Sequence, residues 1–376
     1  MAVARLVAID LPAGQGFVDA LRRAWDDGDA VLPVDQRLPQ PAKAALLDAL
    51  KPEALVGADE TVALREGQPC EPGDAAVVAT SGTTGEPKGV VLTHQAVASS
   101  AIATSRRLGV DPTRHRWLAC LPLSHVGGLS VVTRALLTGT PLTVLPGFGV
   151  DDVTANAGPD VFVSLVATAL GRIGAERFHT VVLGGSAPPP SVPANVVTTY
   201  GLTETGSGVV YDGVPLEGVE VVVDPGSGEI ALRGPMLCRG YRDGTTPLDR
   251  HGWLATGDAG WLDTTGRLHV EGRLSELIIT GGENVWPAAV EAVLSRHPSV
   301  AEAAVAGRPD PEWGQRVVAW VVPRPGVGPP TLEALREFVR DNLAPYAAPK
   351  ELVVVNELPK TVLGKVPREA LPTAEG

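Results

Sequence analysis

Residue types that can hold an oxyanion are concentrated in one stretch of this sequence, from Thr80 to Val90. Glycines let backbone N–H groups approach an anion closely, hydroxyl groups add neutral donors, and a lysine adds a point charge. The spacing is not that of a Walker A loop, and on composition alone a flexible surface turn is the alternative. We predict a phosphate-holding loop made of Thr80, Ser81, Gly82, Thr83, Thr84, Gly85 and Lys88.

A second polar stretch has the chemistry to bind the rest of a nucleotide. Tyr200 can stack on a purine face, and Thr203 can donate to a phosphate. Glu204 offers a hard oxygen ligand suited to Mg²⁺ between phosphates, although an acid between threonines is usually a solvated loop residue. Small residues after the apolar run 180–183 leave room for a flat ligand, or form a plain turn: Gly184, Gly185 and Ser186.

Three single residues can do chemistry, and each has a structural alternative. His125 can position a reacting group, or it can be a packed core or helix-start residue. Asp258 can accept hydrogen bonds from both ribose hydroxyls, or it can close a turn onto its own backbone. Lys365 can supply a cation to a reacting centre, or it can be one of the solvated lysines of a basic run.

Apolar periodicity predicts the elements that position these residues. Strands are expected at 30–34, 75–79, 117–121, 161–166, 180–183, 317–322 and 352–355, with an antiparallel section at 219–234. Helices are expected at 17–25, 41–50, 94–108 and 332–343, and from 287 onward; Thr93 can cap the third of these. A chain of 376 residues favours two domains.

Composition excludes several classes of function. The formal net charge of −12 argues against nucleic acid or an anionic membrane surface as the main partner. The three cysteines have no paired spacing, which fits a reducing compartment better than a disulfide scaffold or a zinc site. We find no convincing signal peptide and no apolar run of the roughly 18 residues that a membrane helix needs. We therefore expect a cytoplasmic protein, either a monomer or a homodimer.

From residue 73 to residue 368 these stretches occur in an order that resembles the adenylate-forming superfamily. That group comprises acyl-CoA synthetases, luciferases and the adenylation domains of peptide synthetases. The resemblance implies that ATP is bound with Mg²⁺, that a small carboxylic acid is activated as an acyl-adenylate, and that CoA accepts the acyl group. It makes Glu204 the metal ligand.

The same resemblance gives further residues their roles. It adds Gly201, Arg273, Gly281 and Gly282 to the ATP-binding and CoA-binding residues, although Arg273 could also be a surface residue of a hairpin. It places Lys365, His125 and Thr84 at the reacting carboxylate. It lines the acid pocket with His125, Ser164, Gly184 and Gly208.

The resemblance also implies an α/β fold in two domains. Residues 1–274 would form a large N-terminal domain of layered mixed sheets with helices, shortened at its start. Residues 275–376 would form a small, mobile α+β domain that carries Lys365. Ser275 stands at the family's hinge position. A swing of the small domain about Ser275 would withdraw Lys365 from the reacting centre and bring the 281–284 segment toward a pantetheine channel.

The run 121–129 is similar to that of the o-succinylbenzoate–CoA ligases of menaquinone biosynthesis. Peptide-synthetase domains usually carry an Asp here that pairs with an amino group, and its absence disfavours an amino acid substrate. Three hypotheses follow: a ligase for o-succinylbenzoate, an adenylating enzyme for another aryl or acyl acid or for a carrier protein, and a nucleotide-binding protein that has lost catalysis and serves as an interaction module.

Replacing Lys365 by Ala should separate the two half-reactions. Attack of a carboxylate on the α-phosphate brings two anions together, and an oriented cation at such a transition state contributes about 3–4 kcal/mol. Lys365→Ala should therefore slow adenylation by roughly 10²–10³, while preformed acyl-AMP and CoA still give the thioester. Pyrophosphate exchange and thioester assays measure the two steps, and equal loss in both would contradict the assignment.

Overall fold

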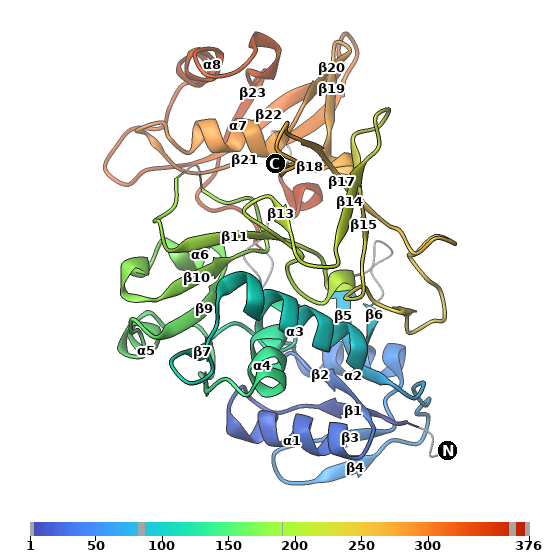
Figure 1. Cartoon of the computed structure of the whole chain (residues 1–376). Helices are drawn as coiled ribbons and strands as arrows, with labels where there is room; N and C mark the ends of the chain where they lie inside the picture. The colour runs from blue at the N-terminus through green and yellow to red at the C-terminus, as the bar shows by residue number, and fades with distance from the viewer. Residues whose placement is uncertain (1–3, 82–86, 190, 361–365, 373–376) are drawn as a thin grey trace. The chain divides into compact units, whose positions relative to one another are not determined.

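The computed structural model (Figure 1) describes residues 4–81, 87–189, 191–360 and 366–372. The chain forms two compact units. The first contains residues 1–222, 231–256 and 263–268, and the second contains residues 223–230, 257–262 and 269–376. The expected α/β class is confirmed, with a large N-terminal part of mixed sheets and helices followed by a smaller C-terminal part. The domain boundary at 274/275 stays a prediction.

One mixed sheet of the first unit carries the strands on either side of the predicted phosphate loop. β5 and β6 form an antiparallel hairpin that pairs Thr80 with Lys88 and Ser81 with Pro87. β1, β2 and β5 run parallel to one another. In sheet order the strands are β16 (Gly240–Tyr241), β6 (Pro87–Thr93), β5 (Asp74–Ser81), β2 (Ala30–Pro33), β1 (Leu6–Ile9), β3 (Ala54–Val56) and β4 (Thr61–Ala63), and the helices α1 (Gln15–Asp26) and α2 (Gln40–Leu50) connect the parallel strands.

The second sheet of this unit contains the strands whose ends carry most of the other predicted site residues. β7, β9, β10 and β11 are parallel, so their carboxyl ends lie at the same edge. β9 is buried along its whole length, as expected for a parallel strand covered on both faces. In sheet order the strands are β13 (Val214–Pro215), β12 (Val210–Tyr211), β11 (Val196–Tyr200), β10 (Thr180–Leu183), β9 (Val161–Leu165), β7 (Arg116–Ala119) and β8 (Leu142–Val144).

One helix near this sheet, at 94–108, begins and ends where the sequence predicts, and the other helices near it were not predicted. The hydroxyl of Thr93 accepts a hydrogen bond from Ala96 N at 3.1 Å, which confirms the predicted cap. That helix ends at Gly109, whose φ of +65° is left-handed and favours glycine. The helices and short 3₁₀ turns are α3 (His94–Leu108), α4 (Val126–Thr138), α5 (Val150–Ala155), α6 (Ala167–Leu170), η1 (Ala175–Arg177) and η2 (Thr203–Thr205).

A four-stranded sheet follows in the chain, in the order β14 (Glu220–Val223), β15 (Glu229–Arg233), β17 (Leu254–Leu262) and β18 (Leu268–Arg273). The second unit has its own sheet and its own core, in which the buried faces of two helices pack on the strands. Its elements are η3 (Leu274–Glu276), β19 (Ile278–Thr280), β20 (Glu283–Val285), α7 (Pro287–Leu294), β21 (Val300–Asp310), β22 (Gly314–Pro323), α8 (Leu332–Arg340), η4 (Pro345–Ala347), β23 (Glu351–Val354) and η5 (Arg368–Ala370). The sheet order is β20-β19-β22-β21, and β23 pairs with β22.

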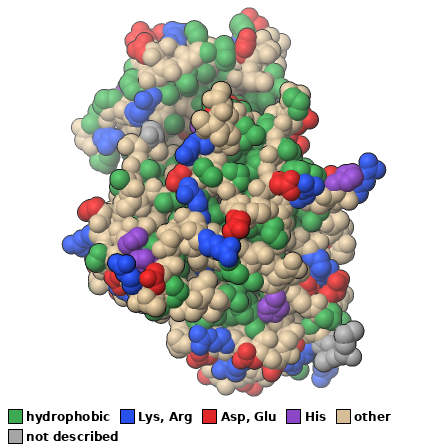
Figure 2. Space-filling model, in the orientation of Figure 1, with side chains coloured by type: hydrophobic (Ala, Val, Ile, Leu, Met, Phe, Trp, Pro, Cys, Tyr) green, Lys and Arg blue, Asp and Glu red, His purple; other side chains and the backbone are tan. Residues whose placement is uncertain are grey.

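Two surface properties bear on the partners expected from composition. Among the described residues, no helix has the length and apolar character needed to cross a membrane. The face seen in Figure 2 carries acidic and basic side chains near one another. This mixture differs from the basic stripe that marks many nucleic-acid-binding surfaces.

Candidate active site

His125 lies where strands of the two larger sheets end. It immediately precedes α4, so the interpretation of His125 as a helix-start residue is correct. Its imidazole also belongs to a charged cluster, because Nε2 lies 3.5 Å from Asp35 Oδ2 and 3.3 Å from Arg37 Nη2. Asp35 follows β2 of the first sheet, and His125 follows β7 of the second. Ligands of α/β proteins commonly bind at such carboxyl ends.

Arg37 fixes the charge of this cluster. Its Nη2 and Nε hold the two carboxylate oxygens of Asp35 at 2.6 and 2.8 Å. Burial by itself would raise the pKa of Asp35, but the hydrogen bonds and charge of Arg37 outweigh burial and lower the pKa to about 2. Asp35 is therefore a carboxylate throughout the neutral range, and it faces one edge of the His125 ring.

Lys88 and Glu204, from the two predicted phosphate-binding stretches, lie against the same tyrosine. The hydroxyl of Tyr241 donates to Glu204 Oε1 at 3.0 Å. Lys88 Nζ lies 5.3 Å from the centroid of the Tyr241 ring. The structure thus brings together a cation from β6 and a carboxylate from η2, two groups suited to a polyphosphate and its metal ion.

The loop between β5 and β6 falls largely outside the described residues. This applies to Gly82, Thr83, Thr84 and Gly85. At its base, the Thr80 hydroxyl donates to Lys88 O at 3.4 Å. The hairpin therefore fixes both ends of the predicted phosphate loop, and the path of the loop itself stays a prediction.

Close packing explains three of the predicted site glycines. A Cβ at Gly184 would lie 2.6 Å from Thr199 Oγ1, and one at Gly208 would lie 2.8 Å from Thr199 Cβ. A Cβ at Gly201 would lie 2.3 Å from Ser207 O. Without side chains at these positions, the end of β11 (residues 199–201) can lie close to residues 207–208 and to the end of β10.

The other predicted residues of this edge are also close to strand ends. Ser164 is buried in β9, and Tyr200 is the half-buried last residue of β11. Gly185 has a φ of +84°, which supports the turn interpretation of this glycine pair, and Ser186 is exposed beside it. Thr203 is the first residue of η2.

In the second unit, the two predicted ribose-binding residues form an ion pair. Arg273 Nε lies 2.8 Å from Asp258 Oδ1, and the Asp258 side chain is only 9% exposed. Asp258 lies inside β17 and Arg273 ends β18, so neither belongs to a simple surface turn. The preceding Gly257 has a φ of +70° and donates from its backbone N to Glu229 Oε1 at 3.0 Å. The carboxylate is therefore held rigidly.

The residues assigned to the hinge and to the CoA step also lie in the second unit. Ser275 is part of η3, and Gly281 and Gly282 form the turn between β19 and β20, with φ of +61° and +85°. A Cβ at Gly281 would lie 2.7 Å from the Trp313 ring. Lys365 lies outside the described residues.

Arg368 anchors the short described segment that follows Lys365. Its Nε donates to Glu276 Oε2 at 2.8 Å, and its Nη1 contacts Glu291 Oε1 and Val305 O. Glu276 is the neighbour of Ser275 in η3. The tail of the chain is therefore tied to the residues beside the predicted hinge.

α4 carries a buried cation for which the structure offers few partners. The side chain of Arg134 is 2% exposed, and its Nη2 donates to Ser207 Oγ at 3.2 Å. The guanidinium carbon lies 4.7 Å from the centroid of a Trp117 ring. Within the described part of the chain, Arg134 Nε and Nη1 have no hydrogen-bond partner. The side chain lines a small cavity together with Ser130 and Gly206.

Sequence reasoning missed Asp35, Arg37, Arg134 and Tyr241. Asp35 follows a predicted strand, and an acid at that position is a recognisable signal of a ligand site. Arg134 and Tyr241 gave no such signal. An arginine at position 134 resembles any polar residue of an amphipathic helix, and its burial depends on strands far away in the sequence.

Comparison with known proteins identifies the family. The sequence model of the AMP-binding enzyme family matches residues 17–242, and that of the AMP-binding enzyme C-terminal domain matches residues 289–365. The chain belongs to the AMP-binding enzyme family, as its resemblance to adenylate-forming enzymes predicted.

Relatives within the family are more particular. A probable 2-succinylbenzoate–CoA ligase of Mycobacterium tuberculosis is 42% identical, over 97% of both chains. A 2-succinylbenzoate–CoA ligase of Bacillus cereus is 37% identical over 78% of this chain and 69% of its own length. The o-succinylbenzoate CoA synthetase of Bacillus subtilis, solved with the acyl-adenylate intermediate OSB-AMP, has a TM-score of 0.86 and 28% identity, covering 100% of this chain and 89% of the other.

Removing the charge of Asp35 should make stability less dependent on acid pH. A carboxyl group whose pKa is lowered from 3.8 to about 2 stabilises the folded state above pH 4, by about 2 kcal/mol. This contribution is lost as the pH falls from 4 toward 2. Asp35→Asn should therefore be less stable than the native protein at pH 7, and the difference should shrink below pH 4.

Urea unfolding between pH 3 and pH 7 measures this effect. Asp59→Asn is the matched control, because Asp59 is exposed and its replacement should change stability little at any of these pH values. A pH-independent difference for Asp35→Asn would contradict the electrostatic account.

Proposed function

We propose that this protein is an ATP-dependent acid–CoA ligase that converts o-succinylbenzoate to o-succinylbenzoyl-CoA in menaquinone biosynthesis. The relatives described above are named as ligases for the same acid, and one of them is 42% identical along nearly the whole chain. The ATP-bound and magnesium-bound form of the Bacillus subtilis synthetase, 28% identical with a TM-score of 0.84, supports ATP and Mg²⁺ as requirements of this chain too.

The reaction has two displacements. A carboxylate does not acylate a thiol directly, because oxide is a very poor leaving group. In the first step a carboxylate oxygen attacks the α-phosphorus of ATP. The bond between the α-phosphorus and the oxygen that bridges to the β-phosphate breaks, and pyrophosphate leaves with its electrons. In the second step the CoA sulfur attacks the acyl carbon, its proton goes to solvent or a base, and AMP leaves with the bonding electrons.

The residues of this chain supply the groups that these steps need. Glu204 is suited to hold Mg²⁺ on the phosphates, where the ion would neutralise part of their charge. Lys88, at the base of the phosphate loop, supplies a second positive charge. Asp258, paired with Arg273, is held in place to accept the ribose hydroxyls. The remaining steps, which involve Lys365 and a swing about Ser275, rest on the family resemblance.

The 2-succinylbenzoate–CoA ligase relatives carry the choice of acid, and Arg134 is the cation that we propose for its second carboxylate. Within the described part of the chain, Arg134 is 2% exposed and its Nε and Nη1 have no hydrogen-bond partner. Such a buried cation is costly unless an anion reaches it. Burial lowers the pKa of Arg134, yet a guanidinium stays charged in proteins. Arg134 contacts Ser207, whose neighbour Gly208 is a predicted pocket residue. A second carboxylate on the acid, as in o-succinylbenzoate, would neutralise this charge.

The alternatives are weaker on the same ground. A fatty acid or a simple aryl acid has one carboxylate, which is consumed by adenylation, so such an acid would bring no counter-charge to Arg134. If the acyl group were loaded onto a carrier protein, only the thiol that accepts it would differ from CoA. That alternative does not say which acid is activated. We further propose a cytoplasmic location and a homodimer, and sedimentation would show twice the mass of the single chain.

A substrate panel tests the acid directly. Thioester formation from ATP, Mg²⁺ and CoA should be at least 10²-fold more efficient with o-succinylbenzoate than with benzoate or a medium-chain fatty acid, because only the first places an anion at Arg134 (about 3 kcal/mol). Comparable kcat/KM values for the fatty acid would contradict the proposal. Pyrophosphate exchange with no acid at all would contradict adenylation altogether.

Replacing Arg134 tests the residue itself. Arg134→Met should reduce kcat/KM for o-succinylbenzoate by about 10²–10³ and leave the KM for ATP unchanged. It should not lower the melting temperature, because an apolar side chain of similar length removes an incompletely paired buried charge. Arg134→Lys should retain part of the activity. An Arg134→Met variant that is unstable and equally impaired toward benzoate would point to a purely structural role.

A further inference from the structure

We propose that Tyr241 is a positioning residue for the metal step: its hydroxyl orients the Glu204 carboxylate toward Mg²⁺-ATP, and its ring holds Lys88 at the phosphate loop. This inference rests on the proposed function, since it takes adenylation to need a metal ion at Glu204.

Glu204 is held at two points by one short segment of the chain. Its backbone carbonyl accepts from Cys238 N at 2.7 Å. Its carboxylate Oε1 accepts from the Tyr241 hydroxyl at 3.0 Å. With both main chain and side chain fixed from the 238–241 segment, Glu204 has little rotational freedom, which lowers the entropic cost of binding a metal ion.

The hydrogen bond has a fixed direction. A carboxylate only accepts, so the tyrosine hydroxyl must be the donor. Metal-bound carboxylates are commonly oriented by such outer donors.

The carboxylate oxygens of Glu204 are suitable ligands for Mg²⁺. This ion prefers oxygen ligands and is usually held by one or two carboxylates together with substrate phosphates. Glu204 offers one carboxylate, and the Lys88 ammonium lies on the same tyrosine ring, 5.3 Å from its centroid. A cation over an aromatic face is attracted by the ring, so Tyr241 restrains both charged groups.

β16, which carries Tyr241, is held to β6 by its backbone. Gly240 and Tyr241 pair with Val91 and Val90 of β6, and Arg242 N donates to Gly89 O at 2.7 Å. A two-residue edge strand has few hydrogen bonds of its own, so its position depends on other contacts.

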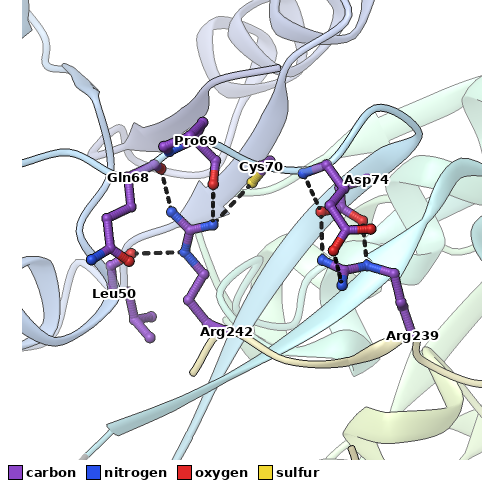
Figure 3. A network of polar contacts seen from close by, with 8 residues as sticks. Leu50, Gln68, Pro69, Cys70, Asp74, Arg239 and Arg242 are labelled. Atoms are coloured by element: carbon purple, nitrogen blue, oxygen red, sulfur yellow. Dashed lines mark hydrogen bonds and ion pairs between the residues drawn. The ribbon is translucent and has the colours of Figure 1, made fainter. Parts of the chain in front are cut away.

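Two arginines supply those contacts, as Figure 3 shows. Arg239 holds both carboxylate oxygens of Asp74 at 3.0 and 2.9 Å, and Asp74 is 1% exposed. A bidentate pair with a buried carboxylate has defined geometry and is costly to break.

Arg242 is fixed in a different way, by backbone carbonyls. Its Nε donates to Leu50 O at 3.1 Å, its Nη1 donates to Pro69 O at 2.7 Å, and its Nη2 contacts Gln68 O. The guanidinium therefore connects β16 to the end of α2 and to the segment before β5 (Figure 3). Together the two arginines fix the residues on either side of Tyr241.

The test separates the hydroxyl from the ring. Tyr241→Phe removes only the donor to Glu204, and Tyr241→Leu removes the ring under Lys88 as well. Binding of Mn²⁺ to the enzyme with a non-hydrolysable ATP analogue, followed by electron paramagnetic resonance, reads out the metal site without turnover. Tyr241→Phe should weaken Mn²⁺ binding by about 10–100-fold. Tyr241→Leu should weaken binding of the analogue itself as well.

Two controls show whether the effect belongs to Glu204. Tyr211→Phe removes another buried tyrosine hydroxyl, one that lies 3.1 Å from Thr104 Oγ1, and should leave Mn²⁺ affinity unchanged. In a Glu204→Gln background, Tyr241→Phe should have no further effect, since the two residues act through one contact.

The outcomes separate the two proposals. If the native protein binds the nucleotide and Mn²⁺ and Tyr241→Phe binds Mn²⁺ equally well, the positioning role is wrong and the proposed function stands. If the native protein binds neither, the proposed function itself fails. Additive effects of Tyr241→Phe and Glu204→Gln would also overturn the positioning role.

Discussion

Electrostatic repulsion is the constraint that explains most of this arrangement. An acid and a polyphosphate repel each other, and they can react only where positive charge is already in place. We propose that restrained cations meet this requirement: Lys88 over Tyr241 and Arg37 on Asp35 in the first unit, and Arg273 on Asp258 in the second. A cation restrained in this way needs little reorganisation when negative charges come together.

The fold brings these residues near one another without long connecting segments. Four parallel strands end at one edge, so short loops after β7, β9, β10 and β11 converge without long insertions. The first sheet adds Asp35 and the β5–β6 hairpin, at whose end the predicted phosphate loop lies. Glycines at 184, 201 and 208 allow the backbone segments around Thr199 to approach closely.

Sequence patterns predicted α3, the central strands and the candidate nucleotide-binding stretches because those features are local, but they did not predict α4 or the long strand β21. The phosphate loop, the stretch from Tyr200 to Gly206 and the cap at Thr93 are each encoded within about ten residues of sequence. The contacts of Tyr241 with Glu204, of Asp35 with His125 and of Arg134 with Ser207 join positions 37, 90 and 73 residues apart. Such contacts depend on which strands become neighbours in the fold, and the apolar periodicity of the sequence does not reveal strand neighbours.

α4 has one further consequence. His125 stands immediately before its first residue, and Arg134 stands nine positions later on the same rigid element. With a rise of 1.5 Å per residue, the two are about 13 Å apart along the axis. Nine positions also make about two and a half helical turns, so α4 carries the strand-end cluster of His125 on one side and the buried guanidinium of Arg134 on the opposite side.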